Sequence, residues 1–327
     1  MGSSAVGGVV EVRRPVDIGQ LRVWLGDADV VQFSEPLTGA EYRSLAGLLA
    51  EHPRVPLRVY GFDRELATLR FLRWFPHVRR FSVAGLHHLA DLAPLDQLSA
   101  DVESLDIGET RKPLDLAPLA GFRRLRRLRV VAHRRGLAEL LHANPGLREL
   151  SLWRLPVDRV LPVVVLPDLR SLALTLGSLA DSEWLAQIPA LRYLALRRVR
   201  ALNDLGPVTR LPALRWLWLE ALTVERLPDF RSSTMLSRVD CVDMHRLRHS
   251  ASLRGLAAAP QLRELRVVAF QLAVDAVVPF ADHPTLQRAW LGLGGERRDR
   301  EARDVVRLPP PRADREFAAA YELTRML

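Results

Sequence analysis

Aromatic and arginine side chains are the residues of this sequence best suited to chemistry, and that chemistry is recognition of another protein. Tryptophan, tyrosine and arginine dominate the binding energy of protein interfaces, and a large exposed aromatic patch marks a surface that a partner covers. Four of the seven tryptophans and one tyrosine fall at equivalent places in a recurring pattern. These aromatic residues are Trp153, Tyr193, Trp216, Trp218 and Trp290. We therefore expect them to form a protein-binding surface.

Charged residues occupy the neighbouring places in the same pattern and predict a rim of mixed charge around the aromatic residues. Small residues such as Ala173 and Ala195 fall between the aromatic positions and predict a shallow depression there. The alternative is that the aromatic residues pack across neighbouring strands, or that a terminal segment covers them. Besides the aromatic residues, the predicted binding surface includes Arg127, Arg129, Arg197, Glu220, Asp240 and Arg266, with Glu149, Arg238 and Glu264 in the same rim.

Motifs for catalysis or cofactor binding are missing from the sequence. It contains no GxxxxGK[ST], GxSxG or HExxH motif, and no GxGxxG follows a predicted strand, so we expect neither an enzyme nor a cofactor. The single cysteine, Cys241, lies near Asp243, His245 and His249, which are metal-ligating residue types. However, Cys241 takes a position that the pattern predicts to be buried, facing away from Asp243. We therefore predict no metal site.

A basic stretch at residues 123–135 supports an alternative function. It holds seven arginines and His133, in a chain of net charge +9. Such a stretch could neutralise nucleic-acid phosphates or another polyanion. No aromatic residue is interleaved there, whereas proteins that bind single strands stack bases on aromatic side chains. The same charge suits an acidic protein partner, which we favour over nucleic acid.

An internal repeat of about 22 residues positions all of these side chains. The pattern L-x-x-L-x-L occurs in four exact and seven weaker copies, at steps of 21 to 26 residues. Alternating apolar residues within each copy are typical of a strand with one buried face. A proline stands two residues before many of the copies, and proline favours extended backbone in its neighbours. The copies begin at Leu57, Val78, Val102, Leu125, Leu147, Leu169, Leu191, Leu214, Leu236, Leu262 and Leu286.

Strand alternation divides each copy between two faces. The fourth and sixth positions point into the core, while the third, fifth and seventh point to the opposite surface. The seventh position places Trp153, Arg197 and Glu220 on that surface. The third and fifth positions place Trp216 and Trp218 there. For the copy at Leu57, the same rule predicts Val59, Gly61 and Asp63 on that surface.

The repeated P-x-L-R-x-L-x-L segments resemble the leucine-rich repeat family, in its bacterial or SDS22-like class of 22-residue repeats. The resemblance implies an α/β fold, a curved solenoid with a parallel β-sheet on its concave face and short helical, 3₁₀ or extended segments on its convex face. It also implies a non-enzymatic scaffold that binds another protein through the concave face. One departure is that the family's asparagine or cysteine at the ninth position is replaced, for example by His133 and Met244.

Repeats expose apolar surface at both ends of an array, so we expect caps. We predict a cap with a first repeat-like unit at 1–56, the solenoid at 57–294, and a charged linker with a capping helix at 295–327. Helices are expected at 39–51, with Thr38 as N-cap, at 64–74 and at 313–326. Phe317, Tyr321 and Leu323 would then close the last repeat. Without a secretory signal or a long apolar run, we expect a cytoplasmic protein with no membrane segment.

Overall fold

The computed structural model describes residues 3–268 and 271–323, which form two compact units, Met1–Leu147 and Arg148–Leu327. We call these the N-terminal unit and the C-terminal unit. In each unit the strands lie side by side in the order of the chain. Apart from the first pair, β1 and β2, all the described strand pairs are parallel. This arrangement confirms the repeating fold that the sequence predicts.

The strands of the N-terminal unit begin before the first predicted copy. Val31 pairs with Leu57, and Leu57 pairs with Phe81, the fourth position of its own copy. Leu57 is therefore a fourth-position residue, and the predicted register of this copy is wrong by three residues. As a consequence Val59 is buried, and Tyr60 faces the opposite side. The strands are β1 (Ser4–Val6), β2 (Val9–Glu11), β3 (Val30–Phe33), β4 (Leu57–Tyr60), β5 (Arg80–Ala84), β6 (Ser104–Ile107) and β7 (Arg127–Val131).

In the C-terminal unit the predicted register is confirmed. Tyr193 pairs with Trp216, which pairs with Arg238, so third-position residues stand in one row across neighbouring strands. Fifth-position residues such as Trp218 and Asp240 form the next row on the same face. The strands are β8 (Glu149–Trp153), β9 (Ser171–Thr175), β10 (Tyr193–Arg197), β11 (Trp216–Glu220), β12 (Arg238–Val242), β13 (Glu264–Val268) and β14 (Arg288–Leu291).

Short helices return the chain from each strand to the next. The predicted helix with Thr38 as N-cap is confirmed as α2 (Gly39–Glu51), where Thr38 and Glu41 form a capping box. The predicted helix at 64–74 is instead two 3₁₀ helices, separated at Leu69, whose φ is +55°. The other helices of the N-terminal unit are α1 (Ile18–Leu25), α3 (Leu137–His142), η1 (Leu66–Thr68), η2 (Arg70–Trp74), η3 (Ala93–Gln97) and η4 (Ala117–Gly121).

Helices of the C-terminal unit are mostly 3₁₀, as the resemblance implies for the convex segments. The charged stretch after β14 forms a helix, α4, which packs against β14 and η10 and so covers the end of the strand row. The helices of this unit are η5 (Leu161–Val163), η6 (Glu183–Gln187), η7 (Gly206–Arg210), η8 (Ser250–Leu253), η9 (Leu256–Ala258), η10 (Val274–Phe280), α4 (Glu296–Val305) and α5 (Asp314–Ala320).

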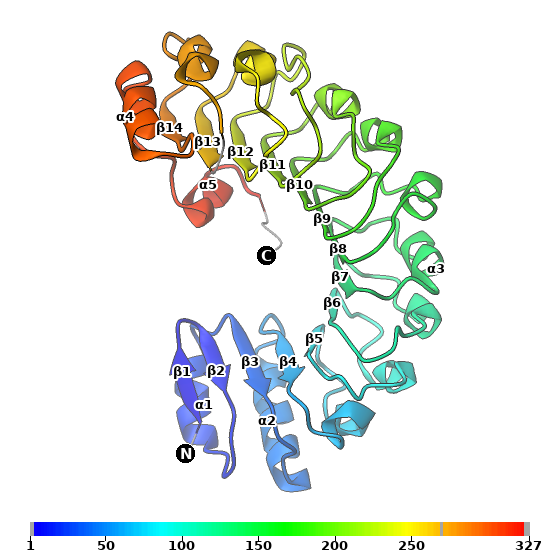
Figure 1. Cartoon of the computed structure of the whole chain (residues 1–327). Coiled ribbons are helices and arrows are strands. Elements are labelled where there is room, and N and C mark those ends of the chain that lie inside the picture. The colour runs from blue at the N-terminus through cyan, green and yellow to red at the C-terminus, as the bar shows by residue number, and fades with distance from the viewer. Residues whose placement is uncertain (1–2, 269–270, 324–327) are drawn as a thin grey trace. The chain divides into compact units, whose positions relative to one another are not determined.

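The leucine core fills the space between the strands and these short helices. Leu217 and Leu219, at the fourth and sixth positions of their copy, are fully buried there. We call the other side of the strands, which carries the third, fifth and seventh positions, the open face. Figure 1 shows that α5 lies on the open face of the C-terminal unit, on the side of the strands away from the 3₁₀ helices.

A left-handed residue ends several strands and turns the chain. Arg154, Arg198 and Ala221 have φ values of 56°, 52° and 49°. Each donates its backbone N–H to the carbonyl oxygen of the seventh-position residue of the next strand, as Ala221 does to Val242 over 2.9 Å. The carbonyl groups of the neighbouring repeat therefore accept the backbone N–H groups of these turns. No side chain is needed to satisfy these N–H groups.

Candidate functional site

The open face of the C-terminal unit carries the aromatic residues that the sequence analysis singled out. Tyr193, Trp216 and Trp218 lie on β10 and β11 and point away from the leucine core, as predicted. However, only 0%, 0% and 8% of their respective surfaces are exposed. The expectation that they face solvent is therefore wrong. They are buried because a segment from much later in the chain covers them.

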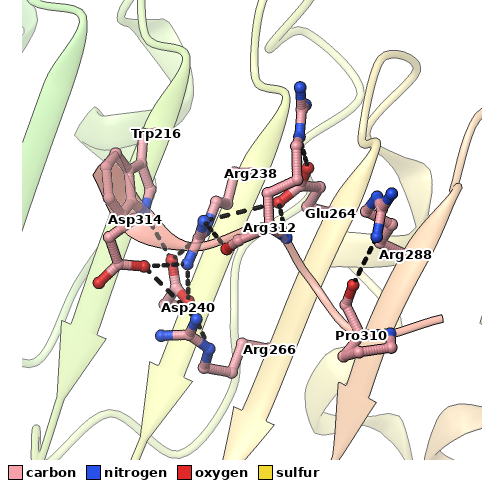
Figure 2. A network of polar contacts seen from close by, with 9 residues as sticks. All are labelled: Trp216, Arg238, Asp240, Glu264, Arg266, Arg288, Pro310, Arg312 and Asp314. Atoms are coloured by element: carbon pink, nitrogen blue, oxygen red, sulfur yellow. Dashed lines mark hydrogen bonds and ion pairs between the residues drawn. The ribbon is translucent and has the colours of Figure 1, made fainter. Parts of the chain in front are cut away.

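The covering segment comprises residues 309–323, which we call the C-terminal segment. It crosses β14, β13 and β12 in turn (Figure 2). Arg288 on β14 donates to the carbonyl oxygen of Pro310 over 3.0 Å. The backbone N–H of Arg312 then donates to Glu264 on β13 over 3.2 Å. Arg238 on β12 donates to the carbonyl oxygen of Arg312 over 3.1 Å. The open face thus binds the backbone of this segment as well as its side chains.

Arg238 is the centre of the contact between the open face and the C-terminal segment, and its side chain is fully buried. It donates to Asp240 on its own strand, Nε to Oδ2 over 2.8 Å and Nη2 to Oδ1 over 3.1 Å. It also donates from Nη2 to Asp314 of α5 over 2.5 Å. Burial works to lower the pKa of Arg238. The hydrogen bond to Asp240 and the charges of Asp240, Asp314 and Glu264 outweigh burial and raise that pKa.

Two further arginines complete a charge-balanced cluster. Arg266 lies with Nε 3.2 Å from Asp240 Oδ1 and with Nη2 3.4 Å from Asp314 Oδ1. Arg312 donates from Nε to Glu264 Oε1 over 2.5 Å. The three arginines thus meet three carboxylates, so no unpaired charge is buried. The charged cluster consists of Arg238, Asp240, Glu264, Arg266, Arg312 and Asp314. The prediction that Arg238, Asp240 and Glu264 belong to an exposed rim is wrong, because all three are buried.

An aromatic cluster adjoins the charged cluster. Phe317 of α5 meets Trp216 edge to face, with ring centroids 5.4 Å apart, and the Tyr193 and Trp216 ring centroids are 4.9 Å apart. The indole N–H of Trp216 donates to Asp240 over 2.6 Å. The guanidinium of Arg238 stands 4.6 Å from the Trp216 ring centroid, a cation–π distance. Trp216 is thus fixed from both sides, and Phe317 seals it from solvent.

The remaining predicted residues of this unit lie around the covered centre. Trp218 donates to Glu220 over 3.3 Å, and the Arg197 guanidinium stands 4.7 Å from the Trp218 ring centroid. Glu220 and Arg197 are partly exposed, as is Trp153. Trp290 on β14 is 50% exposed. Accessible aromatic residues therefore remain on β8 and β14, and partly exposed charged residues remain on β10 and β11.

The end of the chain lies elsewhere than the sequence predicts. Phe317, Tyr321 and Leu323 were expected to close the last repeat. All three pack instead on the aromatic cluster of the open face, while α4 packs against the last strand. The predicted helix ends at Ala320 rather than 326, and residues 324–327 lie outside the described part. The residues missed as site residues are Arg312 and Asp314, and the only sequence signal was their place between a proline run and Phe317.

The sequence matches no protein-family model, and no curated protein is significantly similar to it. Among solved structures, an internalin of Listeria monocytogenes aligns with a TM-score of 0.59 at 16% identity, over 94% of this chain and 87% of that one. This chain has the leucine-rich repeat fold. A leucine-rich repeat protein of Leptospira interrogans (TM-score 0.43, 13% identity, 85% and 75% covered) and internalin C2 of Listeria monocytogenes (0.31, 15%, 66% and 80%) are also similar.

Two ninth-position residues of this leucine-rich repeat chain, His133 and Met244, form hydrogen bonds with backbone groups at the position where the family has an asparagine. His133 accepts the N–H of Leu114 at Nδ1 over 3.1 Å, and its Nε2 lies 2.9 Å from the carbonyl oxygen of Gly108. Met244 accepts the N–H of Leu222 at its sulfur over 3.4 Å. Burial lowers the pKa of His133. His133 is therefore a neutral structural residue and not part of an exposed basic surface.

Arginines of the basic stretch 123–135 are spread over the N-terminal unit. Arg124 pairs with Asp101 over 2.8 Å, and Arg135 pairs with Asp115 over 2.9 Å. Arg129 lies on the open face of this unit and pairs with an acidic residue of β6 over 2.9 Å, while Arg127 is exposed on the same strand. Arg124, Arg129 and Arg135 are thus each paired with a neighbouring carboxylate.

Metal-ligating residues do not gather within the described ranges 3–268 and 271–323, where no group of three or more His, Cys, Asp or Glu side chains is placed to hold a metal ion. Cys241 is buried in the leucine core, and this burial raises the pKa of its thiol. Among the same residues, no helix combines the length and apolar character needed to cross a membrane.

Proposed function

We propose that this chain is a non-enzymatic protein-binding scaffold that acts through the open face of its C-terminal unit. One observation carries the proposal: this face already holds a stretch of polypeptide. The C-terminal segment is bound through its backbone at Pro310 and Arg312, through charge at Asp314, and through an aromatic anchor at Phe317. A surface with these features has what peptide recognition requires, namely backbone hydrogen bonds, a charge contact and a buried aromatic anchor.

The residues proposed to contact a partner fall into two sets. Trp153, Arg197, Glu220, Arg266 and Trp290 are partly or largely exposed and would meet a partner directly. Tyr193, Trp216, Trp218 and Asp240 lie beneath the C-terminal segment and would be reached only where that segment has moved. Arg127 and Arg129 lie on the open face of the N-terminal unit, and we propose that they contact a partner there.

Charge favours an acidic protein partner over nucleic acid. The chain carries a net charge of +9, which attracts acidic surfaces in general. Polyanion binding through residues 123–135 is less favoured, because Arg124, Arg129 and Arg135 are already paired with carboxylates. As part of the proposal we place the scaffold in the cytoplasm, consistent with its use of a single, buried cysteine.

Photo-crosslinking from matched positions tests this proposal. A photoreactive phenylalanine analogue replaces Trp290 on the open face in one variant and Val278 on η10 in the other. The two native side chains are 50% and 53% exposed, so accessibility is matched and only the face differs. Both variants are checked for native circular dichroism before use in cells of the source organism. We expect a discrete crosslinked protein from position 290 that is absent from position 278. Identical products from both positions, or none from 290, would refute binding through the open face.

A further inference from the structure

We propose that the C-terminal segment is an internal ligand that a partner displaces, and that the partner presents an acidic residue followed three positions later by an aromatic residue. This inference rests on the proposed function and adds the chemistry of the partner to it. It also gives the chain a closed state, in which the binding surface is occupied by its own residues 309–323.

The C-terminal segment is not needed to cap the repeats. An array of repeats exposes apolar surface at its last unit, and this surface must be covered. Here α4 packs against β14 and η10, with Ala302 buried in the contact. The segment continues past that cap and turns back over the open face, where leucine-rich strands need no cover. Its position is therefore explained by the side chains it contacts there.

The open face keeps its own hydrogen bonds and ion pairs when the C-terminal segment leaves. Arg238 retains both hydrogen bonds to Asp240 and its contact with Glu264, 3.5 Å from Nη1 to Oε2. Trp216 retains its hydrogen bond to Asp240. Arg266 likewise retains its contact with Asp240 over 3.2 Å. With two arginines and two carboxylates left, the exposed site stays balanced in charge and ordered. It is therefore organised in advance to receive a ligand.

The spacing of the two anchors on the segment, Asp314 and Phe317, indicates what a partner must present. Asp314 and Phe317 are three residues apart on α5, so they lie on the same side of that helix. Asp314 accepts from Arg238 and Arg266, while Phe317 covers Trp216. A carboxylate and an aromatic ring at this spacing are thus complementary to a guanidinium pair beside an indole. A partner helix with the pattern D-x-x-F would make the same contacts.

The C-terminal segment competes with such a partner for the open face, and its covalent attachment favours the segment. Because it is tethered, its effective concentration at the site is on the order of millimolar. A partner with the same two anchors must therefore add contacts that the segment lacks, and Trp290 and Arg197 are the accessible residues beside the covered area that could supply them. Binding by the intact chain is thus expected to be weaker than binding by a chain whose segment has been loosened.

A labelled synthetic peptide of residues 309–323 tests the inference by fluorescence anisotropy. It is titrated with the full wild-type chain and with a full-length variant carrying Asp314→Asn and Phe317→Ala, in which the open face itself is unchanged. We expect the variant to bind the peptide at least about tenfold more tightly than the wild type does. Peptides carrying Asp314→Asn or Phe317→Ala should each bind the variant about tenfold more weakly, the scale of one charge-assisted hydrogen bond or one buried aromatic anchor. A scrambled peptide of the same composition serves as the control.

Several results would overturn the inference. One is a folded variant, judged by circular dichroism, that does not bind the peptide. Another is equal binding of the native and Asp314→Asn peptides. A third is concentration-dependent dimerisation of the wild type with exchange of the segment, which would make a second copy the occupant. If the double variant does not fold, the single Asp314→Asn chain replaces it. These results are independent of crosslinking from position 290, so the internal ligand can fail while the proposed scaffold stands.

Discussion

The contact between Arg238 and Asp314 offers the most direct test of how the C-terminal segment is held. Replacing Arg238 with Met removes a fully buried guanidinium that contacts three carboxylates. Loss of one partner of a buried ion pair costs about 3–5 kcal/mol. Here we expect the lower end, about 3 kcal/mol, because each carboxylate retains another arginine: Arg266 remains beside Asp240 and Asp314, and Arg312 beside Glu264.

A double-mutant cycle isolates the part of this loss that belongs to the segment. Arg238→Met and Asp314→Asn are measured singly and together by urea unfolding, followed by circular dichroism. A buried hydrogen bond between charged groups predicts a coupling of about 1.5–3 kcal/mol. The matched control is the surface pair of Arg124 and Asp101, also in contact over 2.8 Å but 70% and 41% exposed, where we expect about 0.5 kcal/mol.

The cycle can refute the structural argument directly. A coupling between Arg238 and Asp314 no larger than that of the surface control would mean that the segment does not rest on Arg238 in solution. A large coupling with unchanged single-variant stability would contradict the burial of Arg238. Raising salt should separate the two pairs further, because screening weakens exposed ion pairs much more than buried ones.

Three further predictions follow from the described contacts. Phe317→Ala should increase acrylamide quenching of tryptophan fluorescence and lower stability by up to about 3 kcal/mol without loss of far-ultraviolet circular dichroism, since it uncovers Trp216; unchanged quenching would contradict the cover. The pKa values of His133 and His283 are lowered by burial, so the unfolded chain binds protons first and stability should fall as pH drops from about 7.5 to 5.5. His133→Asn should keep the fold and reduce that slope, and an unchanged slope in a pH series of thermal melts would count against the assignment. Ala221→Gly should raise stability by up to about 1 kcal/mol in urea unfolding, because relief of left-handed strain exceeds the entropic cost of glycine; a loss of stability would show that the turn is not strained.

Strand positions in the C-terminal unit were predictable from the sequence because each repeat carries its own local signal. Alternating leucines fix which face of a strand is buried, and one residue of slip would bury every polar neighbour. The copy at Leu57 shows where this logic weakens. Its first position is Arg54 rather than an apolar residue, and Leu57, Tyr60 and Phe62 have the spacing of the first, fourth and sixth positions, which gave a match three residues out of register.

The segment 64–74 shows a second limit. The sequence predicts one helix here, and Leu66, Leu69 and Leu72 recur within it every three residues. A period of three fits a 3₁₀ helix equally well, because that helix has three residues per turn. The structure has two such helices here, and all three leucines are buried. Length and apolar content alone do not distinguish the two kinds of helix in so short a connection.

The covered state of the aromatic residues could not be predicted from repeat patterns. Arg238 meets its two contacts on the C-terminal segment across 74 and 76 residues of sequence. No periodic signal links such distant positions, and α5 is too short to show an amphipathic pattern. The sequence did identify Trp216 and Trp218 as the residues of the open face that need a cover. It left open whether a terminal segment of the same chain or another protein supplies that cover.

The proposed binding face must satisfy two opposing requirements, and the C-terminal segment meets both. Tyr193, Trp216 and Trp218 form an aromatic surface that would associate nonspecifically if it were left exposed. Replacing them with polar residues would remove that hazard together with the anchors for a partner. A tethered segment with one carboxylate and one aromatic anchor covers the surface while leaving its side chains in place. The contacts of the segment are few, and another helix can reproduce them. In the proposed mechanism a ligand that matches both anchors displaces the segment. A ligand that is only apolar does not, because it leaves Arg238 and Arg266 without the carboxylate that Asp314 supplies.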